Sequence, residues 1–370
     1  MHARRTLATV SMTAIFLVAC GSGAGPASPA AQKAAAVATG ATGPGASNPG
    51  CVVGVSWAVR IGRWEQWDEP GIKQAVLAAG GSYLSNDAAR SATTQAANVD
   101  SLIAKGATVL VIVAQDGVAI GQVVAAAASR GIPVIAYDRL IDDPAALYVT
   151  FDNVEVGRMQ ARALLAAAPK GDYLFIKGDK ADANSDLLRS GQAEILAAAI
   201  TAGDIVNVGE TYIRDWDPGV AQSQTGIYLA ANGNRIAAVL AENDGMAGGV
   251  IAALDAVHLA GTAAVSGEDG DRDALHAVAL GTQTVGVWKD ARTLGTAAGN
   301  AAVQLCAGAT AGTISGTTAF QSPTGKTLRS ILIDPVAITR DNLDVVLKAD
   351  WIPQAELCAD IAPGSVAACG

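Results

Sequence analysis

The feature that most constrains the fold is a regular alternation of short apolar runs with longer helix-like segments, which begins at Val52. The apolar runs have the length and composition of strands buried on both faces of a parallel sheet. Several of the segments between them end at a glycine, a common helix stop. The expected strands are 52–59, 82–87, 107–115, 132–137, 147–153, 172–178, 205–213, 236–243 and 263–269. This alternation predicts a right-handed, doubly wound parallel sheet.

The alternation is long enough for two such sheets, because it restarts after a boundary near residues 151–153. A later helix at 291–307 and a strand at 329–338 are surplus to the second sheet, so we expect the chain to return to the first lobe and cross again. The predicted fold is therefore α/β, with two doubly wound parallel-sheet lobes joined by a multi-strand hinge. The predicted boundaries are 51–151 plus 289–328 for the first lobe, 152–288 plus 329–350 for the second, and 351–370 for a C-terminal tail.

The N-terminal end has the features of an export signal. The basic "MHARR", an apolar stretch and "LVAC" (17–20) predict a signal peptide over 1–19. The last four residues resemble a lipobox, which predicts a lipidated Cys20; the alternative is an ordinary signal with a chance cysteine. Residues 20–50 are mainly glycine, alanine, serine and proline, as in a flexible tether. We therefore expect an extracytoplasmic protein that is anchored to the cell membrane through Cys20.

The remaining cysteines indicate disulfides rather than a metal site. Cys51, Cys306, Cys358 and Cys369 form an even set in an exported chain. Cys358 and Cys369 bracket a short tail, so we pair them, and the Cys51–Cys306 pair follows by elimination. No histidine lies near these cysteines in the sequence. The formal net charge of −9 lacks the basic character of nucleic-acid binding proteins, so no nucleic-acid partner is expected.

Polar side chains follow the expected strands where each one ends. Asp138 and Arg139 come directly after the run 132–137. In open α/β sheets the carboxyl ends of the strands line the crevice where ligands bind. The same pattern recurs in both lobes, so we expect these side chains to converge on one site. The candidates are Arg63, Trp64, Asp138, Arg139, Asp182, Asn184, Trp216, Asn243, Asp269 and Lys289.

The chemistry of these side chains fits an uncharged ligand with many hydroxyl groups. Carboxylates offer acceptors, arginine and lysine offer donors, and asparagine offers both. A sugar hydroxyl donates and accepts at once. The apolar faces of a sugar ring suit indoles, so Trp64 from one lobe and Trp216 from the other are candidates for stacking on the ring.

Motifs along the mature chain resemble those of the periplasmic sugar-binding proteins of ABC importers, and most of all the D-xylose-binding proteins. The matching stretches are "RW" (63–64), "AYDRLI" (136–141), "FDNVEVGRMQA" (151–161), "DANSDLLRSGQ" (182–192), "END" and "MAGG" (242–249), "SGEDGD" (266–271) and "GTQTVGVWK" (281–289). The resemblance implies the periplasmic binding protein type I fold and no catalytic activity. In the first loop, "SWAVRIG" lacks an acidic pair expected of a xylose binder, which leaves the exact sugar open.

The resemblance also implies a role for each candidate. Arg63, Asp138, Arg139, Asp182, Asn184, Asn243, Asp269 and Lys289 would contact sugar hydroxyls, and Trp64 and Trp216 would stack on the ring. The implied partners are an ABC permease with its ATPase and the membrane reached through the lipid anchor. The protein is expected to act as a monomer without a cofactor.

Other functions remain to be weighed. A secreted glycosidase would need a carboxylic acid that holds its proton, but Arg139 and Lys289 would keep nearby carboxylates ionised. A binder of glucose or other aldoses, and a sugar-sensing subunit, stay open as alternatives.

Overall fold

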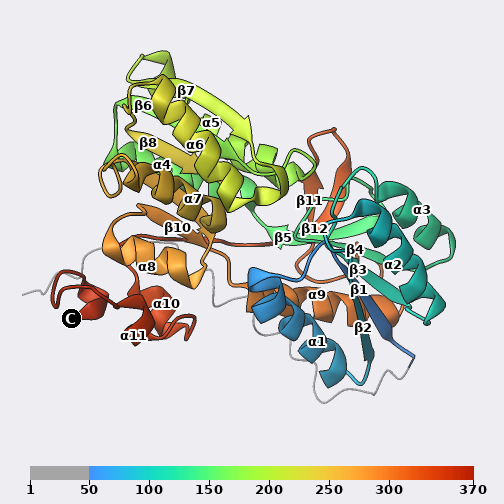
Figure 1. The fold of residues 1–370 in the computed structure, drawn as a ribbon. Coiled ribbons are helices and arrows are strands. Elements are labelled where there is room, and N and C mark those ends of the chain that lie inside the picture. Colours follow the sequence, from blue (N-terminus) through green and yellow to red (C-terminus); the bar gives the residue numbers. More distant parts are fainter. Residues whose placement is uncertain (1–49) are drawn as a thin grey trace, which may run out of the picture. The chain divides into compact units, whose positions relative to one another are not determined.

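The computed structural model describes residues 50–370. The predicted signal peptide, the lipidated Cys20 and all but the last residue of the predicted linker lie outside these residues. The described chain forms two α/β lobes, each built on its own sheet (Figure 1). Among the described residues, no helix has the length and apolar character needed to cross a bilayer.

The first lobe contains a seven-stranded sheet in the order β11-β12-β5-β4-β3-β1-β2. All neighbouring strands are parallel except the β11–β12 pair. The strands are β1 (Val52–Trp57), β2 (Ser82–Asp87), β3 (Val109–Ile112), β4 (Val134–Tyr137), β5 (Ala146–Phe151), β11 (Thr318–Gln321) and β12 (Thr327–Ile333). One face packs against α1 (Glu69–Ala78) and α9 (Ala291–Cys306), and the other against α2 (Ala92–Ala104) and α3 (Gly121–Ser129).

The second lobe contains a six-stranded sheet in the order β13-β10-β9-β8-β6-β7, parallel except for the β10–β13 pair. Its strands are β6 (Gly171–Lys177), β7 (Ile205–Tyr212), β8 (Ala238–Ala241), β9 (Ala264–Asp269), β10 (Val285–Trp288) and β13 (Val336–Ile338). Its two faces pack against α4 (Asn153–Ala167) with α5 (Ala183–Thr201), and against α6 (Pro218–Ala231) with α7 (Asp244–Asp255). The predicted fold class is confirmed.

The chain passes between the lobes at three places: 151–153, 288–291 and 333–336. The third crossing corrects the predicted domain boundaries. The sequence predicts one strand over residues 329–338, with residues 329–350 in the second lobe. Instead β12 pairs with β5 up to Ile333 and belongs to the first sheet, and β13 joins the second. Pro335 lies between them, where a residue without a backbone N–H interrupts a strand.

The C-terminal segment 351–370 follows α10 (Asp344–Lys348) and holds α11 (Gln354–Leu357) and a short 3-10 turn (Ala367–Cys369). Trp351, Ile352 and Leu357 pack into an apolar cluster with α8 (Arg272–Leu280) and β10. The structure contains both disulfides that the sequence predicts. Cys51 bonds to Cys306 at a Cα–Cα distance of 5.4 Å, and Cys358 bonds to Cys369 at 5.5 Å.

Candidate functional site

Arg63 is the centre of a buried network at the carboxyl ends of the strands. Its guanidinium is 8% exposed and pairs with three carboxylates. Nη2 donates to Asp138 at 2.6 Å and Nη1 to Asp68 at 3.0 Å, both in the first lobe. Nε donates to Asp269 of the second lobe at 3.1 Å. One arginine therefore joins the two lobes directly.

Asp138 and Arg139 lie where the prediction placed them, directly after β4. The backbone of Asp138 is left-handed, with φ of 63°, an uncommon conformation that turns the chain sharply as the strand ends. Burial alone would raise the pKa of the Asp138 carboxyl, but Arg63, Lys289 and Arg139 outweigh it and hold that pKa below its usual value. Asp138 is therefore an ionised acceptor in a buried place.

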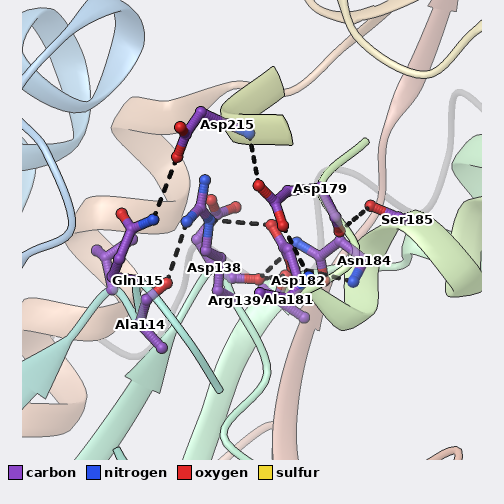
Figure 2. Close-up of polar contacts among 12 residues, drawn as sticks. Ala114, Gln115, Asp138, Arg139, Asp179, Ala181, Asp182, Asn184, Ser185 and Asp215 are labelled. Atoms are coloured by element: carbon purple, nitrogen blue, oxygen red, sulfur yellow. Dashed lines mark hydrogen bonds and ion pairs between the residues drawn. The ribbon is translucent and has the colours of Figure 1, made fainter. Parts of the chain in front are cut away.

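Arg139 makes the second ion pair between the lobes. Its Nε lies 2.9 Å from Oδ2 of Asp182, which begins α5, and its Nη1 donates to the carbonyl of Ala114 at 3.1 Å. Figure 2 shows the guanidinium between these two partners. Beside it, Gln115 donates to Asp215 of the second lobe at 3.4 Å. Charged and polar side chains of each lobe therefore have ion-pair or hydrogen-bond partners in the other lobe.

Amide side chains and one lysine complete the network. Asn184 Nδ2 donates to the carbonyl of Asp138 at 3.1 Å, and its Oδ1 accepts from Asn153 at 3.0 Å. Lys289, 2% exposed, donates to Asn153 at 3.1 Å and pairs with Glu268 at 2.9 Å. Lys289 lies at the second crossing between the lobes, so the network reaches the hinge.

The two predicted tryptophans are placed differently. Trp64 joins the network: its Nε1 donates to Asp138 at 3.1 Å, and the guanidinium of Arg139 lies 5.0 Å from its ring centroid. Trp216 lies against Gly178 and the apolar core of the second lobe. Its indole N–H is buried and, within the described chain, lacks a hydrogen-bond partner.

Within the described residues, the structure joins most of the predicted set into one network and leaves two members outside it. The members joined directly or through Asn153 are Arg63, Trp64, Asp138, Arg139, Asp182, Asn184, Asp269 and Lys289. Asn243 instead accepts the N–H of Met246 at 2.9 Å and begins α7. Trp216 and Asn243 do follow second-lobe strands, as predicted, but within the described chain no hydrogen bond or ion pair of their side chains connects them to Arg63.

Four members of the network were missed by the sequence analysis: Asp68, Tyr137, Asn153 and Glu268. Asp68 is fully buried and accepts from Tyr137 at 2.5 Å as well as from Arg63. Glu268 precedes Asp269 in β9 and holds Lys289. The available signal was their position: Tyr137 and Glu268 lie at strand ends, and Asp68 lies one helical turn past Arg63. Acidic residues in such places are rarely buried without a cationic partner.

These buried carboxyls should make stability depend on pH. Burial raises the pKa of Asp68 to about 7 and that of Glu268 to about 8, although Arg63 and Lys289 lower them. Burial also raises the pKa of Asp271 to about 7. A carboxyl that binds its proton more tightly when folded stabilises the fold below about pH 4 and loses that contribution as the pH rises through its folded pKa.

We therefore expect the melting temperature to fall as the pH rises from about 5 to about 8. Circular dichroism melts at several pH values would measure this. Asp68→Asn, which keeps the acceptor for Arg63 without the titration, should flatten the dependence. A melting temperature that increases toward pH 8 would contradict the expectation.

Gly178 supplies the surface on which Trp216 lies. A Cβ at this position would sit 2.1 Å from Cζ2 of the indole, so any larger residue must displace the ring. We expect Gly178→Ala to change the tryptophan fluorescence and to weaken binding of whatever ligand the ring covers. Gly226→Ala on α6 is the matched control, since a Cβ there would meet nothing within 4 Å. Equal spectra and equal affinity for both variants would contradict the expectation.

The arrangement is suited to binding. Asp138 is held ionised, and it accepts hydrogen bonds from Arg63 and Trp64. Among the described residues, no group of three or more histidine, cysteine or acidic side chains gathers as a metal site would require. The network offers fixed donors and acceptors from both lobes.

Comparison with known proteins identifies the family. The model of the periplasmic binding protein domain matches residues 53–310. The D-xylose-binding periplasmic protein of Escherichia coli (strain K12) is 35% identical over 309 residues, covering 81% of this chain and 90% of that protein. The multiple sugar-binding periplasmic receptor ChvE of Rhizobium radiobacter is 30% identical over 275 residues, covering 68% and 77%.

Solved structures agree with this assignment. A carbohydrate transporter solute-binding protein from Chloroflexus aurantiacus, in complex with D-glucose, has a TM-score of 0.74 and 28% identity, covering 83% of this chain and 98% of that one. The expectation of a binding protein rather than an enzyme is confirmed by these similarities. With a family model that spans most of the described residues and a relative at 35% identity that matches over 90% of its length, the chain belongs to the periplasmic binding protein family.

Proposed function

We propose that the protein is the extracytoplasmic solute-binding component of an ABC sugar importer, and that it binds D-xylose or a closely related monosaccharide between its two lobes. The observation that carries the proposal is that two buried arginines of the first lobe pair with carboxylates of the second at the strand ends: Arg63 with Asp269 at 3.1 Å and Arg139 with Asp182 at 2.9 Å. Each pair places a donor of the first lobe beside an acceptor of the second.

A sugar hydroxyl fits such a place because it accepts from one lobe while it donates to the other. Hydrogen bonds to charged groups contribute roughly 1.5–3 kcal/mol each. The hydroxyls would be held by Arg63, Asp138, Arg139, Asp182, Asn184, Asp269 and Lys289, with Asn243 as a further contact. Trp64 and Trp216 would cover the ring. Because the contacts come from both lobes, the sugar favours the state in which the lobes meet, and binding shifts the hinge equilibrium toward it.

The choice of D-xylose rests on relatives. Two relatives at 35% and 33% identity are named D-xylose-binding periplasmic proteins. The alternative is a broader aldose binder, favoured by solved neighbours in complex with D-glucose at 26% and 28% identity. A sugar-sensing role is compatible with the same site.

The sugar-bound form would then dock on a membrane permease that is driven by a cytoplasmic ATPase. In this proposal the protein acts as a monomer outside the cytoplasmic membrane, held there by the lipid on Cys20. Mass spectrometry of the protein from membranes tests the anchor: a diacylglyceryl group on Cys20 supports it, and an unmodified Cys20 contradicts it.

Isothermal titration of the purified protein with D-xylose, D-glucose, L-arabinose and xylitol tests the sugar. We expect D-xylose to bind most tightly and the open-chain xylitol far more weakly, because xylitol has no ring face for the indoles. Equal affinity for D-glucose would favour the broader aldose binder. No binding of any of the four compounds would refute the proposed function, and release of a chromogenic group from aryl glycosides would favour an enzyme.

A further inference from the structure

Trp351, in the C-terminal segment 351–370, holds the turn that carries Asp269. Its indole is 2% exposed, and its Nε1 donates to the carbonyl of Gly270 at 2.6 Å. Asp269 and Gly270 both have positive φ, 103° and 85°, so the backbone bends sharply just after β9. A non-glycine residue in such a conformation is kept there by its surroundings, and Trp351 supplies one of the fixed contacts.

The same indole contacts the segment that carries Arg63. Trp351 stacks on Trp67, with ring centroids 4.8 Å apart and an interplanar angle of 26°. Trp67 lies in a π-helical turn (Trp64–Asp68) directly after Arg63. This turn also carries Trp64 and Asp68, and Arg63 directly precedes it. Three side chains of the network therefore depend on the position of this turn. Turns of this kind are rare and frequent at functional sites.

Trp351 is thus connected to both partners of the Arg63–Asp269 pair, one through stacking and the other through a hydrogen bond. It is itself fixed from several sides. Arg272 Nε donates to its carbonyl at 3.2 Å, and the guanidinium of Arg292 lies 5.0 Å from its ring centroid. Trp288 of β10 meets it edge-on at 5.5 Å. The Cys358–Cys369 disulfide closes the segment that follows.

We propose that Trp351 is a positioning residue for the sugar site: it stabilises the arrangement in which Arg63 and Asp269 meet, and so raises affinity without touching the sugar. The inference rests on the proposed function. The C-terminal segment 351–370 would then influence ligand binding at a site whose residues come from earlier parts of the sequence. Removal of the indole should favour the state in which the lobes are separated. The apparent affinity for the sugar should then fall in proportion to the fraction of protein that remains in the binding-competent state.

Trp351→Phe tests this step with a small change, because the ring can still stack on Trp67 while the N–H to Gly270 is lost. Tyr173→Phe is the matched control. It also removes one side-chain donor to backbone carbonyls of the second lobe, since the Tyr173 hydroxyl lies 2.6 Å from the carbonyl of Ala168 and 3.1 Å from that of Leu164, but away from the network. Calorimetric titration with the sugar that the wild-type protein binds best, circular dichroism melts and small-angle scattering with and without that sugar are the measurements.

We expect Trp351→Phe to weaken binding about tenfold, as for the loss of one hydrogen bond. Its radius of gyration without sugar should increase relative to wild type and return to the wild-type value at saturation. Tyr173→Phe should lower the melting temperature and leave affinity within about twofold. Trp67→Leu, which leaves the C-terminal segment intact, should weaken binding in the same direction if any Trp351 variant folds poorly.

Two outcomes would overturn the inference. The first is that the wild-type protein binds sugar and both variants, Trp351→Phe and Trp67→Leu, bind it with the wild-type affinity. Trp351 then has only a structural role, and the proposed function stands. If the wild-type protein binds none of the sugars, the proposed function fails, and the assignment of Trp351 to a sugar site fails with it.

Discussion

Replacement of Arg63 by methionine should lower the free energy of unfolding by about 3–5 kcal/mol, the cost of breaking a buried ion pair by removing one partner. The guanidinium neutralises Asp68, Asp138 and Asp269 at once, and it is 8% exposed. Without it Asp68 and Asp269 lose the cation that they contact directly, and Asp138 keeps only the more distant Lys289 and Arg139, so these carboxyls must take up protons or move toward water. Urea unfolding of the sugar-free protein measures the effect.

Arg60→Met is the matched control for this prediction. Arg60 lies three residues earlier and also pairs with a carboxylate, Glu69 at 2.7 Å, but its side chain is 40% exposed. Its partner Glu69 is 11% exposed but also accepts from Tyr83 and Ser85, so this carboxylate keeps two donors when Arg60 is lost, and we expect a smaller loss of stability than for Arg63. If Arg63→Met were no more destabilising than Arg60→Met, the network around Arg63 would not be the buried, charge-balanced centre described above.

Replacement of Asp138 by alanine should reduce sugar affinity at least about 100-fold, since it removes an ionised acceptor whose hydrogen bonds contribute roughly 1.5–3 kcal/mol each. The same change frees Arg63 Nη2 and Trp64 Nε1, which both donate to Asp138, so two further groups lose their orientation toward the ligand. The fold should persist because Arg63 retains Asp68 and Asp269.

Calorimetric titration of Asp138→Ala with D-xylose measures this loss, with Asp100→Ala as the control, since Asp100 lies exposed on α2 of the same lobe. The control should bind as the wild-type protein does. Unchanged affinity in Asp138→Ala would remove Asp138 from the site, whereas equal losses in both variants would indicate a general effect of lost negative charge.

The parts of the site that could be predicted from the sequence follow from one rule of sheet geometry. Parallel strands end at the same edge, so polar residues placed directly after them, such as Asp138, Arg139 and Asp269, must gather there. That rule needs no knowledge of side-chain direction.

The features that could not be predicted depend on the direction in which a side chain points and on local interruptions of helices and strands. Asp68 enters the network because a π-helical turn points it back at Arg63, and such turns leave no reliable pattern in the sequence. Trp216 follows a second-lobe strand, as expected, but its left-handed backbone lays the indole on Gly178. Pro335 interrupts a run whose sequence predicts a single strand. As a result, Leu332 and its neighbours belong to the sheet of the first lobe and not, as predicted, to the second lobe.

The Cys51–Cys306 disulfide has a mechanical consequence. It connects the residue just before β1 to the last residue of α9, and β1 lies in the interior of its sheet, between β2 and β3. A pull applied ahead of Cys51 is therefore shared between β1 and, through the covalent bond, a sixteen-residue helix. Reduction of this bond would leave β1 alone to bear the load, so that it could be drawn out of the sheet hydrogen bond by hydrogen bond.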